Sequence, residues 1–146
     1  MSLGTTVDAT VVGLPDLLFR SIVADYWSEW SRDDPKSGRV WIEVDWDRRI
    51  VLYGFESKAG HGRLEVTVGP ASPTTSRVVE EAQVRPRGLW RLASPLLRSA
   101  ARREEDRDAE RLADRARRAA DAVVAAEDVP IELGGPHCAG RVKWSR

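Results

Sequence analysis

Hydrophobic and polar positions follow two different periods along this chain. Residues 5–12 are rich in β-branched side chains, which is typical of a strand. Over residues 14–30 the apolar positions recur every three or four residues, which predicts an amphipathic helix. Pro15 suits the first turn of that helix, and its last part, residues 25–30, either continues it or forms a short second helix.

From residue 39 the period becomes two, as in half-buried strands. Further strands are predicted at residues 39–46, 50–57, 64–68 and 77–85, separated by polar or glycine-rich connections. One of these connections is expected to be a Gly-His-Gly turn that contains His61. Short connections favour antiparallel pairing.

Residues 88–128 form the longest run of strong helix formers, interrupted early by Pro95. Small and apolar residues recur on one stripe of this helix, and such a narrow stripe needs a surface to cover. We therefore predict an α+β fold, an antiparallel sheet curved around a long C-terminal helix, in the order β-α-(α)-β-β-β-β-α. One domain is expected at residues 4–128, followed by a tail at 129–146 that is either loose or an edge strand.

Three stretches resemble the START-like, or helix-grip, superfamily, which includes the polyketide cyclase/dehydrase-like (SRPBCC) proteins. They are VDATVVGLPDLLFRSIVADYWSEW, VDWDRRIVLYGFE and VVEEAQVRPRGLWRLASPLLRSAARREEDRDAERLADRA. The resemblance implies the same sheet-and-helix fold, with an apolar cavity between the two that holds a small hydrophobic or aromatic molecule. It points to a shortened member, because a pair of the superfamily's strands is missing between residues 30 and 39. An edge left unpaired in this way favours a homodimer.

The side chains that this arrangement would turn toward the cavity are largely aromatic. Such residues either line a ligand site or simply fill a solid core. The expected ligand-binding residues are Trp27, Trp30, Trp46, Tyr53, Phe55, Trp90, Leu97, Ala101 and Leu112.

Three side chains are candidates for acid–base catalysis, and each also has a plainer explanation. Glu80 shares a predicted strand face with Val78 and Val84, and Glu105 lies near the helix stripe. An acid held neutral in apolar surroundings could donate a proton, or it could simply pair with an arginine. His61 either acts at the mouth of the cavity or is an exposed turn residue.

Composition narrows the classes of function. The 23 basic and 23 acidic residues balance, and acids interleave with the arginines of the last helix, so we expect no nucleic-acid partner. Cys138 is the one cysteine, which excludes an internal disulfide and suits the cytoplasm. We expect no metal, no cofactor and no stable membrane insertion, since no corresponding motif or apolar span occurs.

The function predicted from the sequence is therefore the binding or carrying of a small hydrophobic or aromatic ligand, as in lipid transport, rather than catalysis. One alternative is an aromatase/cyclase-like enzyme that acts on a polyketide, and another is a protein-interaction module without a ligand.

Overall fold

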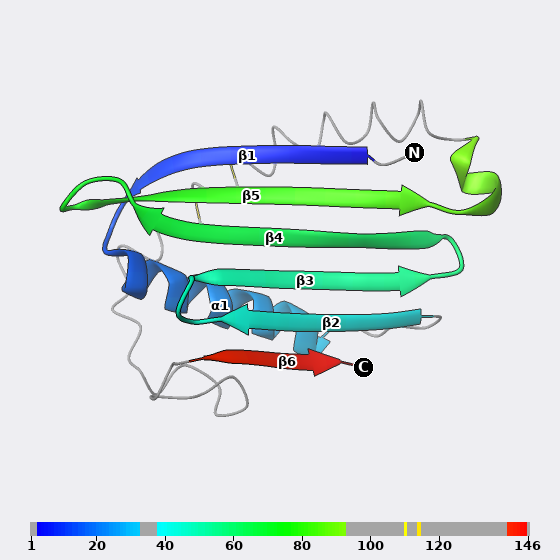
Figure 1. Cartoon of the computed structure of the whole chain (residues 1–146), viewed down its shortest axis with the longest axis horizontal. Coiled ribbons are helices and arrows are strands. Elements are labelled where there is room, and N and C mark those ends of the chain that lie inside the picture. The colour runs from blue at the N-terminus through cyan, green and yellow to red at the C-terminus, as the bar shows by residue number, and fades with distance from the viewer. Residues whose placement is uncertain (1–2, 33–37, 93–109, 111–113, 115–139, 146) are drawn as a thin grey trace.

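The computed structural model describes residues 3–32, 38–92, 110, 114 and 140–145 of the chain (Figure 1). Within these residues an antiparallel sheet packs against one long helix. The elements are, in order, β1 (Leu3–Val12), α1 (Pro15–Arg32), β2 (Gly38–Asp45), β3 (Ile50–Ser57), β4 (Gly60–Pro70), β5 (Thr75–Pro86), the 3-10 turn η1 (Gly88–Arg91) and β6 (Arg141–Ser145).

The strands lie side by side in the order β1-β5-β4-β3-β2-β6, and every neighbouring pair is antiparallel. β2 to β5 form a meander, because the connections between them are too short for any other pairing. Both edges are made by distant segments: β1 pairs with β5, and β6 pairs with β2 (Figure 1).

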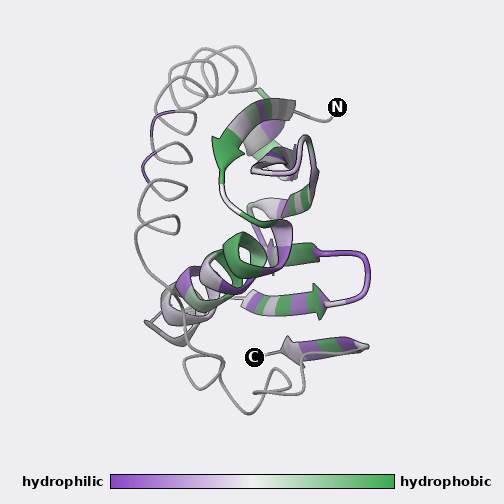
Figure 2. Cartoon of the chain, turned by 90° about the vertical axis from the view of Figure 1, so that its left-hand side faces the viewer, coloured by the Kyte–Doolittle hydropathy of each residue, from purple (hydrophilic) through white to green (hydrophobic). Residues whose placement is uncertain are grey.

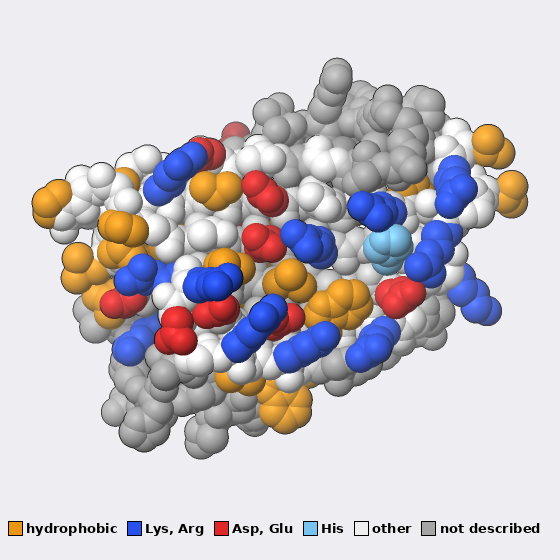
Figure 3. Space-filling view, in the orientation of Figure 1, with side chains coloured by type: hydrophobic (Ala, Val, Ile, Leu, Met, Phe, Trp, Pro, Cys, Tyr) orange, Lys and Arg blue, Asp and Glu red, His pale blue; other side chains and the backbone are white. Residues whose placement is uncertain are grey.

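The two faces of the sheet differ sharply in character. The inner face, which carries Val40, Ile42 and Val44 of β2, packs against α1, and these three side chains are buried. The outer face carries Trp41, Glu43 and Asp45, and Lys, Arg, Asp and Glu side chains are spread across it (Figure 3). Alternation of side chains along a half-buried strand explains the difference.

Apolar residues of α1 repeat every three to four positions and so fall on one side of the helix. Figure 2 shows α1 lying along one side of the sheet. Phe19, at 1% exposure, meets the edge of Trp46 with ring centroids 5.3 Å apart. The buried core comprises Val7, Leu18, Phe19, Ile22, Val23, Tyr26, Trp30, Val40, Ile42, Val44, Trp46, Val51, Val66, Val68 and Val78.

The predicted α+β class with an antiparallel sheet is confirmed, and α1 is one continuous helix rather than two. The register turns Tyr53 and Val51 of β3 inward, because they lie opposite Ile42 and Val44, which are buried on the inner face.

The predicted Gly-His-Gly turn is wrong. Residues 60–62 begin β4, with Gly60 opposite Pro86 and His61 opposite Arg85. Glycines usually mark turns, but Gly62 occupies its strand position because the Phe55 ring lies where a side chain would be: a Cβ built there would sit 2.6 Å from that ring.

The tail pairs with the sheet at β6, one of the two possibilities that the sequence left open. Most of the predicted long C-terminal helix lies outside the described residues. Within it, η1 forms a 3-10 turn, and Glu110 and Asp114 are helical and exposed.

Candidate functional site

The inner face continues the apolar surface of the core toward the end of the sheet where β5 finishes. Tyr53, Leu64 and Ala82 lie opposite one another on β3, β4 and β5. Tyr53 and Leu64 are only partly buried against the core, and Phe55 is 36% exposed. We call these four residues, together with Glu80, the inner wall.

Glu80 is the acidic member of the inner wall, and it is 9% exposed. It lies opposite Val7 on β1 and Val66 on β4, both in the core. Its neighbour Glu81 points to the outer face and is exposed, as strand alternation requires. The predicted face of Glu80 is therefore correct, and the strand places this residue between two apolar residues of the core.

Two glycines leave room for aromatic rings: Gly62 on β4 for Phe55 of β3, and Gly54 on β3 for Trp41 of β2. On the inner face the Phe55 ring lies over Gly62, directly across from it. On the outer face the Trp41 ring lies over Gly54, where a built Cβ would meet the ring at 2.1 Å. Any larger residue at Gly62 would push the Phe55 ring away from the wall.

Three of the expected ligand-binding tryptophans lie in or beside the core. Trp46 is 8% exposed and packs on Phe19. Trp27 stacks on Trp30 at 5.0 Å and meets the edge of Trp144 at 6.2 Å. Trp144 was not among the expected residues, because a single aromatic residue in a glycine- and proline-containing tail carries no periodic signal.

The remaining predicted site residues are not brought together. His61 lies on the outer face, opposite Glu56 and Arg85, so it cannot share a site with Glu80. Its Nδ1 atom is buried without a hydrogen-bond partner among the described atoms. Glu105, Leu97, Ala101 and Leu112 lie outside the described residues, as does the side chain of Trp90.

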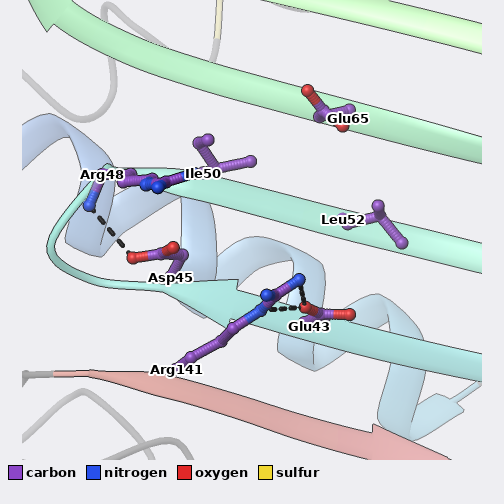
Figure 4. A pocket seen from close by; sticks show the side chains of 7 residues that line it. All are labelled: Glu43, Asp45, Arg48, Ile50, Leu52, Glu65 and Arg141. Atoms are coloured by element: carbon purple, nitrogen blue, oxygen red, sulfur yellow. Dashed lines mark hydrogen bonds and ion pairs between the residues drawn. The ribbon is translucent and has the colours of Figure 1, made fainter.

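A small hollow lies on the outer face (Figure 4). Arg141 of β6 forms an ion pair there with Glu43 of β2, and the backbone N–H of Arg48 donates to Asp45 Oδ1 at 3.1 Å. Its volume of about 120 Å³ is small beside typical ligand pockets of roughly 300–1,000 Å³. This groove is lined by Glu43, Asp45, Arg48, Ile50, Leu52, Glu65 and Arg141. Its ion pair attaches β6 to the edge of the sheet.

Among the described residues, no three His, Cys, Asp or Glu side chains are placed to hold a metal ion. No helix in the same part of the chain combines the length and apolar character needed to cross a bilayer.

No family model matches the sequence, and neither does any curated protein. Solved structures do match the fold. The Zhui aromatase/cyclase from Streptomyces sp. R1128 is similar at a TM-score of 0.61 and 14% identity, over 81% of this chain and 95% of that one. The protein TTHA0849 from Thermus thermophilus gives 0.57 and 11%, over 84% and 99%.

The di-domain aromatase/cyclase BexL, from the BE-7585A biosynthetic pathway, gives a TM-score of 0.56 at 17% identity. The match covers 85% of this chain and 48% of BexL, so the chain spans about half of that protein. At such identities the similarity establishes a shared architecture and leaves the chemistry to be argued from the site.

Proposed function

Because this chain has the helix-grip fold, in a shortened form, we propose that it binds a small hydrophobic or aromatic molecule against the inner wall. The observation that carries the proposal is Glu80, a residue at 9% exposure that lies between the buried Val7 and Val66, on a wall whose Tyr53 and Leu64 are only partly buried. Ligand sites for small molecules combine these two features, a mostly apolar lining and a few polar groups that fix orientation.

Each part of the inner wall has a role in this proposal. Tyr53 and Phe55 supply flat aromatic area, which favours ligands with rings through offset or edge contacts. Leu64 and Ala82 supply the apolar surface between them, and Glu80 accepts a hydrogen bond from a ligand hydroxyl group. A hydrogen bond to a charged acceptor contributes about 1.5–3 kcal/mol, enough to select hydroxylated ligands over plain hydrocarbons.

A matched pair of ligands and a matched pair of variants test this. Binding of β-naphthol and of naphthalene is measured by calorimetry with the full chain, Glu80→Gln and Glu81→Gln. We expect Glu80→Gln to weaken β-naphthol binding roughly tenfold or more while naphthalene binding changes little. Glu81→Gln should bind both as the parent chain does, because Glu81 points to the outer face.

The proposal would be contradicted if neither β-naphthol nor naphthalene bound to the full chain. It would also be contradicted by equal losses in the two glutamate variants, since a carboxyl group on the opposite face cannot contact a ligand on the inner wall. Mass spectrometry of molecules retained from a lipid or quinone extract then identifies the ligand class.

An aromatase/cyclase-like activity on a polyketide is the second candidate function. It is favoured by the same buried acid and by the architecture shared with two aromatase/cyclases at TM-scores of 0.61 and 0.56. In this mechanism the wall holds a reactive chain folded for ring closure, and Glu80 transfers a proton to or from the reacting oxygen.

The two candidate functions separate in the Glu80→Gln variant. A catalytic Glu80 predicts loss of ring-closed product from a poly-β-ketone substrate by at least about a hundredfold, with substrate still bound. Unchanged turnover in Glu80→Gln rejects this mechanism. Glu81→Gln again serves as the control.

A further inference from the structure

One end of the sheet is built from two chain corners that lie side by side. The backbone N–H of Arg87, just after β5, donates to the carbonyl of Ala59 in the β3–β4 turn at 2.8 Å. Gly60 lies opposite Pro86 in the same place. We call this end, residues 56–60 and 85–92, the sheet tip.

Two leucines project from the sheet tip into solvent. Leu89 is 83% exposed and Leu92 is 80% exposed. Gly88 has a φ of 61°, which turns the chain out of β5 and into η1. The backbone N–H of Leu92 donates to the carbonyl of Leu89 at 3.0 Å, and residues three apart in a 3-10 turn lie on the same side. The two leucines therefore form one apolar point.

Basic side chains lie at the same end of the sheet as this apolar point. The exposed cations of the sheet tip are Lys58, Arg85, Arg87 and Arg91, and Arg87 pairs with Glu56 of the same tip at 3.2 Å. At the right-hand end of Figure 3, apolar side chains stand beyond a group of Lys and Arg side chains. The balanced charge of the whole chain conceals this local excess of positive charge.

We propose that the sheet tip docks on the surface of an anionic lipid bilayer. The leucines enter the boundary between headgroups and acyl chains, and the cations of the sheet tip contact the lipid phosphates and carboxylates. Leucine is under-represented at the hot spots of protein–protein interfaces, so two projecting leucines suit a bilayer better than a protein partner. Docking in this proposal is to the surface of the bilayer.

This inference goes beyond the proposed function, because the sheet tip can bind a bilayer whether or not the inner wall holds a ligand. Phe55 and Val84 lie opposite Gly62 near the same end of the sheet, so a docked molecule would bring the inner wall close to the bilayer.

Co-sedimentation of the full chain with vesicles tests the proposal. The vesicles are phosphatidylcholine alone, or with about one-third phosphatidylserine. We expect binding to the anionic vesicles that weakens as salt is added. Leu89→Ser with Leu92→Ser should reduce it at least about tenfold, and Lys58→Gln with Arg85→Gln should reduce it about fivefold per cation removed.

The control is Val12→Ser with Leu14→Ser. These two residues are 69% and 54% exposed, and they lie where β1 leads into α1, at the end of the sheet opposite the sheet tip. The control variant should bind vesicles as the parent chain does. The leucine and control variants alter exposed side chains, so their melting temperatures should match that of the parent chain.

Three results would overturn the proposal: no binding to anionic vesicles, full binding by the double leucine variant, or an equal loss in the control. Failure here and failure of the proposed function are distinguishable, because binding of β-naphthol is measured without vesicles and should be unchanged in the tip variants.

Discussion

Asp8 and Arg77 show how the outer face keeps its charges in pairs. They lie diagonally across β1 and β5, and Arg77 Nε donates to Asp8 Oδ1 at 3.0 Å and to Oδ2 at 3.1 Å. The hydrogen bond from Arg77 holds the pKa of Asp8 below its ordinary value of 3.8, and the attraction of the two charges adds to it. The same pairing raises the pKa of Arg77.

The lowered pKa of Asp8 predicts the sign of a pH effect on stability. Its contribution is present above the unfolded pKa near 3.8 and is lost as the pH falls through the lower folded value. Asp8→Asn should lower Tm by roughly 1–3 °C at neutral pH, because both partners are exposed. Melting curves from pH 7 downward should show this difference closing in acid; a difference that persists unchanged below about pH 3 would refute the assignment.

At the scale of the elements, the glycines of β3 and β4 decide where the aromatic rings lie. Trp41 on the outer face and Phe55 on the inner face each lie over a glycine on the neighbouring strand. Glycine in a strand is normally unfavourable, and here the ring that covers it restores the buried contact. A Cβ at Gly54 would lie 2.1 Å and 2.5 Å from Trp41 Cε2 and Nε1.

Gly54→Ala should therefore lower the free energy of unfolding by about 1–3 kcal/mol, because the indole ring must leave its place. Gly69→Ala is the matched control: it lies in β4, and a Cβ there meets nothing within 4 Å. Urea unfolding followed by tryptophan fluorescence measures both. Equal stability of the two variants would show that the Trp41 ring moves aside without cost.

At the scale of the whole molecule, β6 closes the β2 edge of the sheet. It adds the pairing of residues 141–145 with β2, the Arg141–Glu43 ion pair and the contact of Trp144 with Trp27. An exposed strand edge recruits other chains, so a covered edge opposes self-association. The homodimer expected from the sequence rested partly on an unpaired edge, and it stays a prediction.

Removal of residues 141–146 tests this role of β6. We expect the free energy of unfolding to fall by about 2–4 kcal/mol, with concentration-dependent dimers or larger species appearing in size-exclusion chromatography with light scattering. Lys143→Ala keeps the strand and should change neither. A truncated chain that stays as stable and as monomeric as the parent would exclude β6 as a structural strand.

Much of the architecture could be read from local patterns. The change from a period of about 3.6 to a period of two marks α1 and the meander, because burial on one face repeats at the spacing of each backbone. The inward position of Glu80 followed from the same alternation along β5, and so did the outward position of Glu81.

Long-range pairing settled the rest. The sequence alone could not show that β6 pairs with β2 or that His61 belongs to β4. Each of these features depends on which segments of the chain pair as neighbouring strands. The pairing is set by the free energy of burial and hydrogen bonding summed over the whole sheet. The hydrophobic period of a segment shows that its side chains alternate between two faces. The pairing with its neighbouring strand determines which of these faces packs on the core.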